Sequence, residues 1–188
     1  MSLVNILKEN KKQILDEWFE LLTKTYPRET AQLMVKKRKS LFKSPLERFQ
    51  SPAEYLFVTG LERIFDAITK EEVNWEEIER ALDDILRLRS IQDFTPSRAV
   101  SFVFFLKGII KNYAERHGGI QEFLEFETRI DALACKAFDI YMQCREDLYE
   151  RRVAEVKALR DMAMKALERA TVAYYELEKQ PEELRKKH

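Results

Sequence analysis

A chain of 188 residues is long enough for one folded domain, or for one domain followed by an extended helix. Its 33 basic and 33 acidic side chains balance, so no net charge steers it toward nucleic acid or acidic lipid. Hydrophobic residues make up 45% of the sequence, whereas Gly and Pro number only 4 and 5, which favours long helices around a hydrophobic core.

No segment of the sequence is typical of export or membrane insertion. Residues 2–10 are polar and too few for the apolar region of a signal peptide. No window approaches the roughly 20 apolar residues that span a bilayer. Cys135 and Cys144 would lie about 13 Å apart along one helix, too far for a disulfide within the chain. The sequence therefore predicts a cytoplasmic protein with reduced thiols.

The N-terminal quarter predicts two helices. Apolar residues recur at helical spacing from Leu3 to Thr25, which indicates one amphipathic helix that Tyr26-Pro27 ends. A shorter helix is expected from Pro27 to about Lys39. The basic run inside it, Lys36 to Lys39, is interpreted as a solvated helix end rather than as a nucleic-acid contact.

Two similar segments then predict helix starts. Ser44-Pro45-Leu46-Glu47 and Ser51-Pro52-Ala53-Glu54 each place Ser at the N-cap, Pro at the first helical position and Glu two residues later. We expect the first to open only a turn and the second to open a helix that runs to about Thr69.

Two further helices have marked ends. Asn74, with Glu77 three residues later, caps a helix that should run to about Ile91. Thr95-Pro96 opens the next helix, which Gly118-Gly119 closes. This helix is apolar nearly all round, so we place it at the centre of the core.

Gly60 and Gly108 interrupt otherwise regular helices. Each costs about 1 kcal/mol relative to Ala in a helix interior. The usual benefit of such a glycine is the close approach of another backbone. We therefore expect the helices that contain Gly60 and Gly108 to pass near each other.

The last third predicts one long helix, either straight or kinked, from Ile120 to Gln180, with Pro181 as its stop. Its first half is apolar enough to pack on the domain. Its second half is polar with one narrow apolar stripe, at the alternating spacing of a coiled coil: Val156, Leu159, Ala163, Ala166, Ala170, Ala173 and Leu177. Such a helix is not expected to be stable alone, so we predict a homodimer seam along Val156, Leu159, Ala163, Ala166 and Ala170.

The sequence thus predicts an all-α protein in two parts. Residues 1–145 form a helical domain, and residues 146–188 form an extended helix with a short charged tail. No arrangement typical of catalysis or metal binding appears. The only histidines are His117 and His188, and no His-His or Cys-His spacing suits zinc. There is no Gly-rich phosphate loop, so we predict a non-enzymatic protein without a cofactor or metal.

One segment carries a family resemblance. Residues 88–107 contain Arg89-x-x-Gln92-Asp93-Phe94-Thr95-Pro96-Ser97, then Ala99-x-x-Phe102 and Leu106-Lys107. This pattern resembles the signature of the RsbRD N-terminal domain family. Residues 48–52 resemble the family's Arg-Phe-x-Asn-Pro turn, and residues 15–27 resemble its opening helix. The resemblance covers roughly residues 3–149.

The resemblance implies a globin-like helical sensor domain without haem, as at the N-terminus of the RsbR-type stressosome proteins that act as RsbT co-antagonists. In such relatives a long exit helix leads to a STAS domain. No STAS domain follows here before His188, which favours a free-standing sensor or adaptor. The expected function is a signalling module that relays its state through the long helix to a protein partner. A structural adaptor without a ligand is the alternative, and a helical enzyme or haem sensor is a third reading.

The motif itself has two interpretations, and both stay open. Arg89, Gln92 and Asp93 either tie the loop to the helix that follows it, or form a site for a ligand or protein partner.

Overall fold

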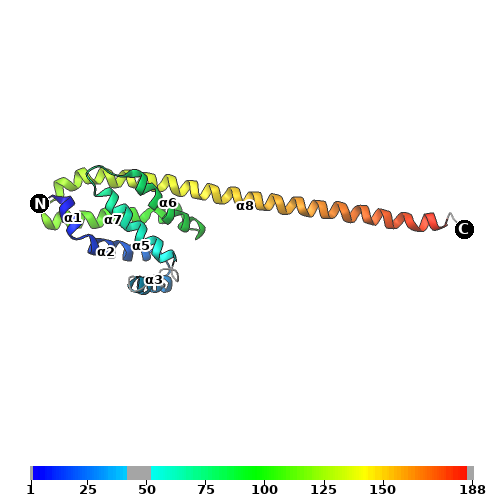
Figure 1. The fold of residues 1–188 in the computed structure, drawn as a ribbon, viewed down its shortest axis with the longest axis horizontal. Helices are drawn as coiled ribbons and strands as arrows, with labels where there is room; N and C mark the ends of the chain where they lie inside the picture. The colour runs from blue at the N-terminus through cyan, green and yellow to red at the C-terminus, as the bar shows by residue number, and fades with distance from the viewer. Residues whose placement is uncertain (1, 42–51, 186–188) are drawn as a thin grey trace. The chain divides into compact units, whose positions relative to one another are not determined.

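The computed structural model describes residues 2–41 and 52–185, with side chains at 2–37 and 52–177. These described residues form helices and no strands, which confirms the all-α class. The helices are α1 (Leu3–Glu9), α2 (Lys11–Thr23), α3 (Arg28–Leu41), α5 (Pro52–Ile68), α6 (Trp75–Ile91), α7 (Pro96–His117) and α8 (Ile120–Arg185) (Figure 1). The chain divides into two compact units, Met1–Arg145 and Glu146–His188. Across the described ranges, every helix is too short or too polar to cross a bilayer.

The single helix expected from Leu3 to Thr25 is wrong, because the chain breaks at Asn10 into α1 and α2. Asn10 leaves the helical conformation, with φ −101° and ψ 12°. Its side-chain Nδ2 donates to the carbonyl of Ile6 at 2.8 Å. Asparagine competes in this way with the regular backbone ladder, which periodicity does not reveal. Both helices bury one apolar face in the core.

Helix α7 contributes more buried residues than any other helix in the first 117 positions, and it packs on α1, α2 and α6. Trp18 of α2 shows how closely the two helices fit. Its Nε1 donates to the carbonyl of Phe102 at 2.6 Å. The two rings stack with their centroids 6.1 Å apart. The predicted place of this helix in the core holds for most of its apolar side chains, whereas Phe104 is 52% exposed.

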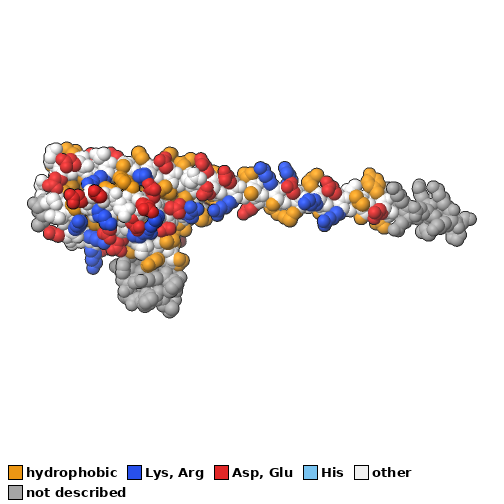
Figure 2. Space-filling view, turned by 45° about the horizontal axis from the view of Figure 1, so that its top comes forward, with side chains coloured by type: hydrophobic (Ala, Val, Ile, Leu, Met, Phe, Trp, Pro, Cys, Tyr) orange, Lys and Arg blue, Asp and Glu red, His pale blue; other side chains and the backbone are white. Residues whose placement is uncertain are grey.

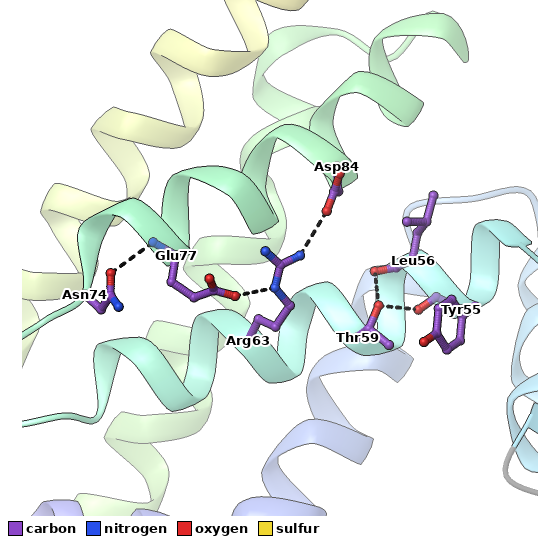
Figure 3. Close-up of polar contacts among 7 residues, drawn as sticks. All are labelled: Tyr55, Leu56, Thr59, Arg63, Asn74, Glu77 and Asp84. Atoms are coloured by element: carbon purple, nitrogen blue, oxygen red, sulfur yellow. Dashed lines mark hydrogen bonds and ion pairs between the residues drawn. The ribbon is translucent and has the colours of Figure 1, made fainter.

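Helices α5 and α6 form an extensive helix pair. A Cβ on Gly60 would lie 2.8 Å from Cδ1 of Ile85, so glycine is what lets the two helices approach. Arg63 of α5 adds polar contacts: its Nε donates to Glu77 Oε1 at 2.5 Å and its Nη1 to Asp84 Oδ2 at 3.0 Å (Figure 3). The predicted cap is confirmed, since the N–H of Glu77 donates to Asn74 Oδ1 at 3.1 Å.

The expectation that Gly60 and Gly108 mark one helix crossing is wrong. Gly60 faces Ile85 and Ala81 of α6. A Cβ on Gly108 of α7 would meet no heavy atom of its surroundings within 4 Å. The sequence shows that a glycine lies inside a helix, where it lowers stability relative to alanine. Only the packed structure shows which neighbour, if any, the glycine accommodates.

Helix α8 changes character along its length. In the first unit it buries an apolar row at helical spacing: Phe123, Phe126, Ile130, Leu133, Ala137, Tyr141 and Cys144. In the second unit every described side chain from Tyr149 onward is exposed, and apolar groups alternate with charged ones (Figure 2). The predicted stop at Pro181 is wrong, because α8 continues to Arg185. Proline removes one hydrogen bond and bends a helix, which does not oblige the helix to end.

Helix α3 ends at Leu41 rather than at about Lys39, and the other predicted helix ends are confirmed to within about one residue, at Ile68, Ile91, Pro96 and His117. Gly118 closes α7 with φ 74°, the left-handed conformation that glycine adopts without strain. The turn predicted at residues 44–47, the Ser51 cap, the turn at 48–52 and the side chains of Arg38 and Lys39 lie outside the described residues.

Candidate functional site

The loop between α6 and α7, residues 92–95, carries the centre of the sequence motif. Asp93 has φ 55°, a left-handed conformation that aspartate tolerates better than most residues. The N–H of Phe94 turns back to the carbonyl of Arg89 at 3.4 Å. As a result Phe94 points into the core, while Gln92 and Asp93 are exposed.

Arg89 lies under this loop and is completely buried. Its guanidinium carbon is 4.3 Å from the ring centroid of Phe94 and 5.5 Å from that of Tyr26. Its Nη2 donates to Thr25 Oγ1 at 2.7 Å and to the carbonyl of Arg98 at 3.0 Å. A single side chain thus contacts the segment after α2, the loop and the first turn of α7.

The electrostatics of Arg89 reflect this burial. Loss of solvent lowers the pKa of the Arg89 guanidinium to about 10. Within the described chain its Nε and Nη1 have no hydrogen-bond partner. The aromatic rings offset part of the desolvation cost through cation–π attraction, which strengthens when a cation is removed from water. The Arg89 guanidinium does not reach the surface, and its hydrogen bonds connect the segment after α2 with the first turn of α7.

The two exposed motif residues are also bonded within the chain. The hydroxyl of Tyr26 donates to Gln92 Oε1 at 2.8 Å. On the other side of the loop, Nη1 of Arg145 donates to Asp93 Oδ1 at 3.2 Å and to the carbonyl of Ser90 at 3.3 Å. The structure therefore brings Arg89, Gln92 and Asp93 to one loop, with their side chains directed to different segments.

Helix α8 holds the loop at a second point. The buried hydroxyl of Tyr141 donates to the carbonyl of Phe94. Tyr141 and Arg145 are one helical turn apart, on the last turns of α8 before the boundary between the units. We call these two bonds, Tyr141 to Phe94 and Arg145 to Asp93, the loop–α8 contact. Sequence reasoning missed both α8 residues, and a polar pair at i, i+4 on an otherwise apolar face was the available signal.

The residues of the predicted dimer seam lie in the second unit. Val156 and Leu159 are 65% and 62% exposed, and Ala163, Ala166 and Ala170 are exposed as well. They follow one side of α8 at the predicted spacing. The seam stays a prediction, because it requires a second copy of the chain to pack on these residues.

The described histidine and carboxylate groups are not gathered at one place in the fold. His117 is exposed in the last turn of α7, with its ring stacked on Tyr113 at a centroid distance of 6.4 Å. Over residues 2–41 and 52–185, no three His, Cys, Asp or Glu side chains are grouped as metal ligands.

Substitution of Asp93 separates the backbone conformation of the loop from its ion pair. Asp93→Ala should lower the free energy of unfolding by about 1 kcal/mol. Alanine is strained in the left-handed conformation, and it has no polar side chain that could form a local hydrogen bond. Asp93→Asn should change it by less than about 0.5 kcal/mol, because asparagine tolerates this conformation and an exposed ion pair contributes little. Urea denaturation of both variants measures the difference. Equal losses for the two variants would contradict this account.

Tyr26 makes the stability of the protein depend on alkaline pH. Burial raises the pKa of the Tyr26 phenol to about 12, above its ordinary value of 10.0. Between these two pH values the unfolded chain loses this proton first, so stability falls as pH rises. Tyr26→Phe has no phenol to ionise. The stability advantage of the wild type over this variant should therefore shrink from pH 9 to pH 11.

Urea denaturation at each pH measures that advantage. Tyr55→Phe, at an exposed position of α5, is the control for the loss of a phenol. A difference between wild type and Tyr26→Phe that stays constant with pH would contradict the buried phenol.

Comparison with known proteins identifies the family. An uncharacterized protein of Archaeoglobus fulgidus is 29% identical over 112 residues, which cover 58% of this chain and 73% of that protein. No solved structure matches the chain. Residues 12–156 match the family described as the RsbT co-antagonist protein rsbRD N-terminal domain. The match spans all of the motif, the loop–α8 contact and the start of the second unit. The chain therefore belongs to the RsbRD N-terminal domain family.

Proposed function

We propose that this protein is a non-enzymatic signalling module that relays the state of its first unit through α8 to a protein partner. One observation carries the proposal. Helix α8 is bonded to loop 92–95 by Tyr141 and Arg145, and it continues from there into a unit whose described side chains are all exposed from Tyr149 onward. Membership of the family supports a role in stressosome-like signalling.

The loop–α8 contact suits a relay because each of its bonds is directional. A shift of the loop that moves the Phe94 carbonyl or the Asp93 carboxylate must break these bonds or carry Tyr141 and Arg145 with it. Two discrete arrangements of one packed element are the physical requirement for coupling between distant sites. A ligand or protein that binds one arrangement of the loop more tightly would then shift the equilibrium between two arrangements of α8. The size of that shift is set by its difference in affinity for the two arrangements of the loop.

The exposed stripe of the second unit supports a homodimer in the proposal. An isolated helix with so narrow an apolar face is marginally stable in water, and burial of the stripe against a second copy supplies the missing stability. The polar residues that flank the stripe remain available to an output partner.

The seam is tested by the double substitution Val156→Lys and Leu159→Lys. Two lysines per chain at the seam should weaken self-association by at least about tenfold, because each pairing would bury charge without a partner. Sedimentation over a range of protein concentrations measures the dissociation constant.

The matched control is Ala154→Lys with Ala158→Lys, which adds the same charge to the opposite side of α8. We expect this control to self-associate like the wild type. Equal dissociation constants for the two double variants would remove the seam from the proposal.

A structural adaptor without a ligand is the second candidate function. It is favoured by the bonds that Arg89, Gln92 and Asp93 already make within the chain. A candidate ligand site away from these residues is a groove of about 660 Å³ between α2 and α5, with Leu15, Phe19, Val58 and Leu61 among its lining residues. Its volume lies within the usual range for small-molecule sites.

A thermal-shift screen separates the sensor from the adaptor. A small apolar or amphipathic molecule that binds the folded chain should raise its melting temperature, and Val58→Trp should abolish that rise by filling the groove. A screen without any such rise would favour the adaptor.

A further inference from the structure

The groove of about 660 Å³ between α2 and α5 has the composition of a small-molecule site. Leu15 and Phe19 of α2 form its apolar lining together with Val58 and Leu61 of α5, whereas its other described lining residues are charged. Ligand sites typically combine an apolar lining with a few polar groups that fix the orientation of the ligand. The charged residues therefore indicate which chemical class of ligand the groove takes.

The described rim of the groove is charged but carries no net charge. Its basic residues are equal in number to its acidic ones: Lys8, Lys11 and Lys12 against Glu9, Asp16 and Glu62. A ligand with a charged group at this rim would lose part of its hydration without meeting an excess of opposite charge. The balance of charges therefore favours a ligand that is itself uncharged.

Ion pairs join the two helices that form the walls of the groove. Nζ of Lys11, at the start of α2, lies 2.8 Å from Glu62 Oε1 and 2.8 Å from Asp66 Oδ1, both on α5. The Lys11 ammonium is thereby compensated within the chain, so it does not require a carboxylate from a ligand. All three side chains remain partly exposed, and a ligand hydroxyl can therefore hydrogen-bond at this end without burying a new charge.

We propose that this groove binds an uncharged amphipathic molecule, with its hydroxyl-type polar group at the Lys11 end and its apolar part on Leu15, Phe19 and Val58. From Lys11 to Phe19 the wall extends about 12 Å along α2, which suits an unbranched chain of about that length. The proposal rests on the proposed function only in treating this molecule as the input of the relay.

Helix α2 connects the groove to the motif. The segment that follows α2 contains Thr25, whose Oγ1 accepts from Arg89 Nη2 at 2.7 Å and whose carbonyl accepts from Arg98 Nη2 at 2.5 Å. Trp18 of α2 is also bonded to the carbonyl of Phe102 on α7. A molecule that changes the distance between α2 and α5 therefore acts on the residues that surround loop 92–95.

Titration calorimetry of the full-length chain at neutral pH tests the ligand class. The probes are octanol, octanoate and octylammonium, which share one apolar chain and differ in the charge of the polar group. Octanol should bind at least about tenfold more tightly than either charged probe, and Val58→Trp should abolish its binding by filling the groove. The proposal is overturned if a charged probe binds as tightly as octanol, or if octanol does not bind up to its solubility limit.

Charge changes at the rim test where the polar group lies. Lys11→Gln leaves the carboxylates of Glu62 and Asp66 without their lysine, and it should raise the affinity for octylammonium relative to octanol by about threefold. Glu62→Gln should raise the relative affinity for octanoate by a similar factor. The matched control is Lys24→Gln, an exposed position of the same helix end as Glu20, outside the groove, and it should change neither ratio. Unchanged ratios in both folded rim variants would overturn the assigned position.

A separate measurement distinguishes this proposal from the relay. Sedimentation with and without saturating octanol reports whether the occupied groove changes self-association through the second unit. Binding of octanol without such a change would support the ligand class and count against the relay. Absence of octanol binding would overturn the ligand class and leave the loop–α8 contact available to another input.

Discussion

The arrangement of the segments at the centre of the first unit depends on one buried guanidinium. Arg89 is removed from water, and only two of its possible hydrogen bonds are formed, to Thr25 and to the carbonyl of Arg98. Such a charge is tolerated only if aromatic faces and fixed acceptors surround it. The loop that supplies Phe94 and the turn that supplies Tyr26 are therefore held in place by one side chain. Any rearrangement of loop 92–95 alters the surroundings of the Arg89 guanidinium. Such a rearrangement therefore changes the free energy of the folded chain steeply.

The same loop connects the core to α8. The ring of Phe94 packs on the Arg89 guanidinium, and its carbonyl accepts a hydrogen bond from Tyr141. One residue therefore takes part both in the core around Arg89 and in the loop–α8 contact. Asp93, in a left-handed conformation, directs its carboxylate to Arg145. The proposed relay depends on these contacts of the loop with α8. Membership of the family supports a signalling role.

The motif illustrates how far sequence reasoning reaches at a site. It singled out Arg89, Gln92 and Asp93 as residues of one loop, and left open whether they tie the loop or bind a partner. Their spacing contains no information on direction, since that depends on the left-handed turn at Asp93. The turn sends Phe94 inward and leaves Gln92 and Asp93 exposed, whereas Arg89 lies on the buried face of α6. Tyr141 and Arg145 lie some 50 positions away in the sequence, and their i, i+4 spacing marks a pair on α8 without linking it to the loop.

Local rules determined the all-α class and most helix ends from the sequence alone. Asn74, Thr95-Pro96 and Gly118 act on backbone groups within a few residues, so their effect is readable without the fold. Tertiary structure decided the features that depend on distant neighbours or on competition between weak preferences. It decided that Asn10 divides the first helix, and that Gly60 faces α6 while Gly108 faces open space. It also decided that the loop is bonded to α8, because a hydrogen bond between residues far apart in the chain exists only once packing has brought them together.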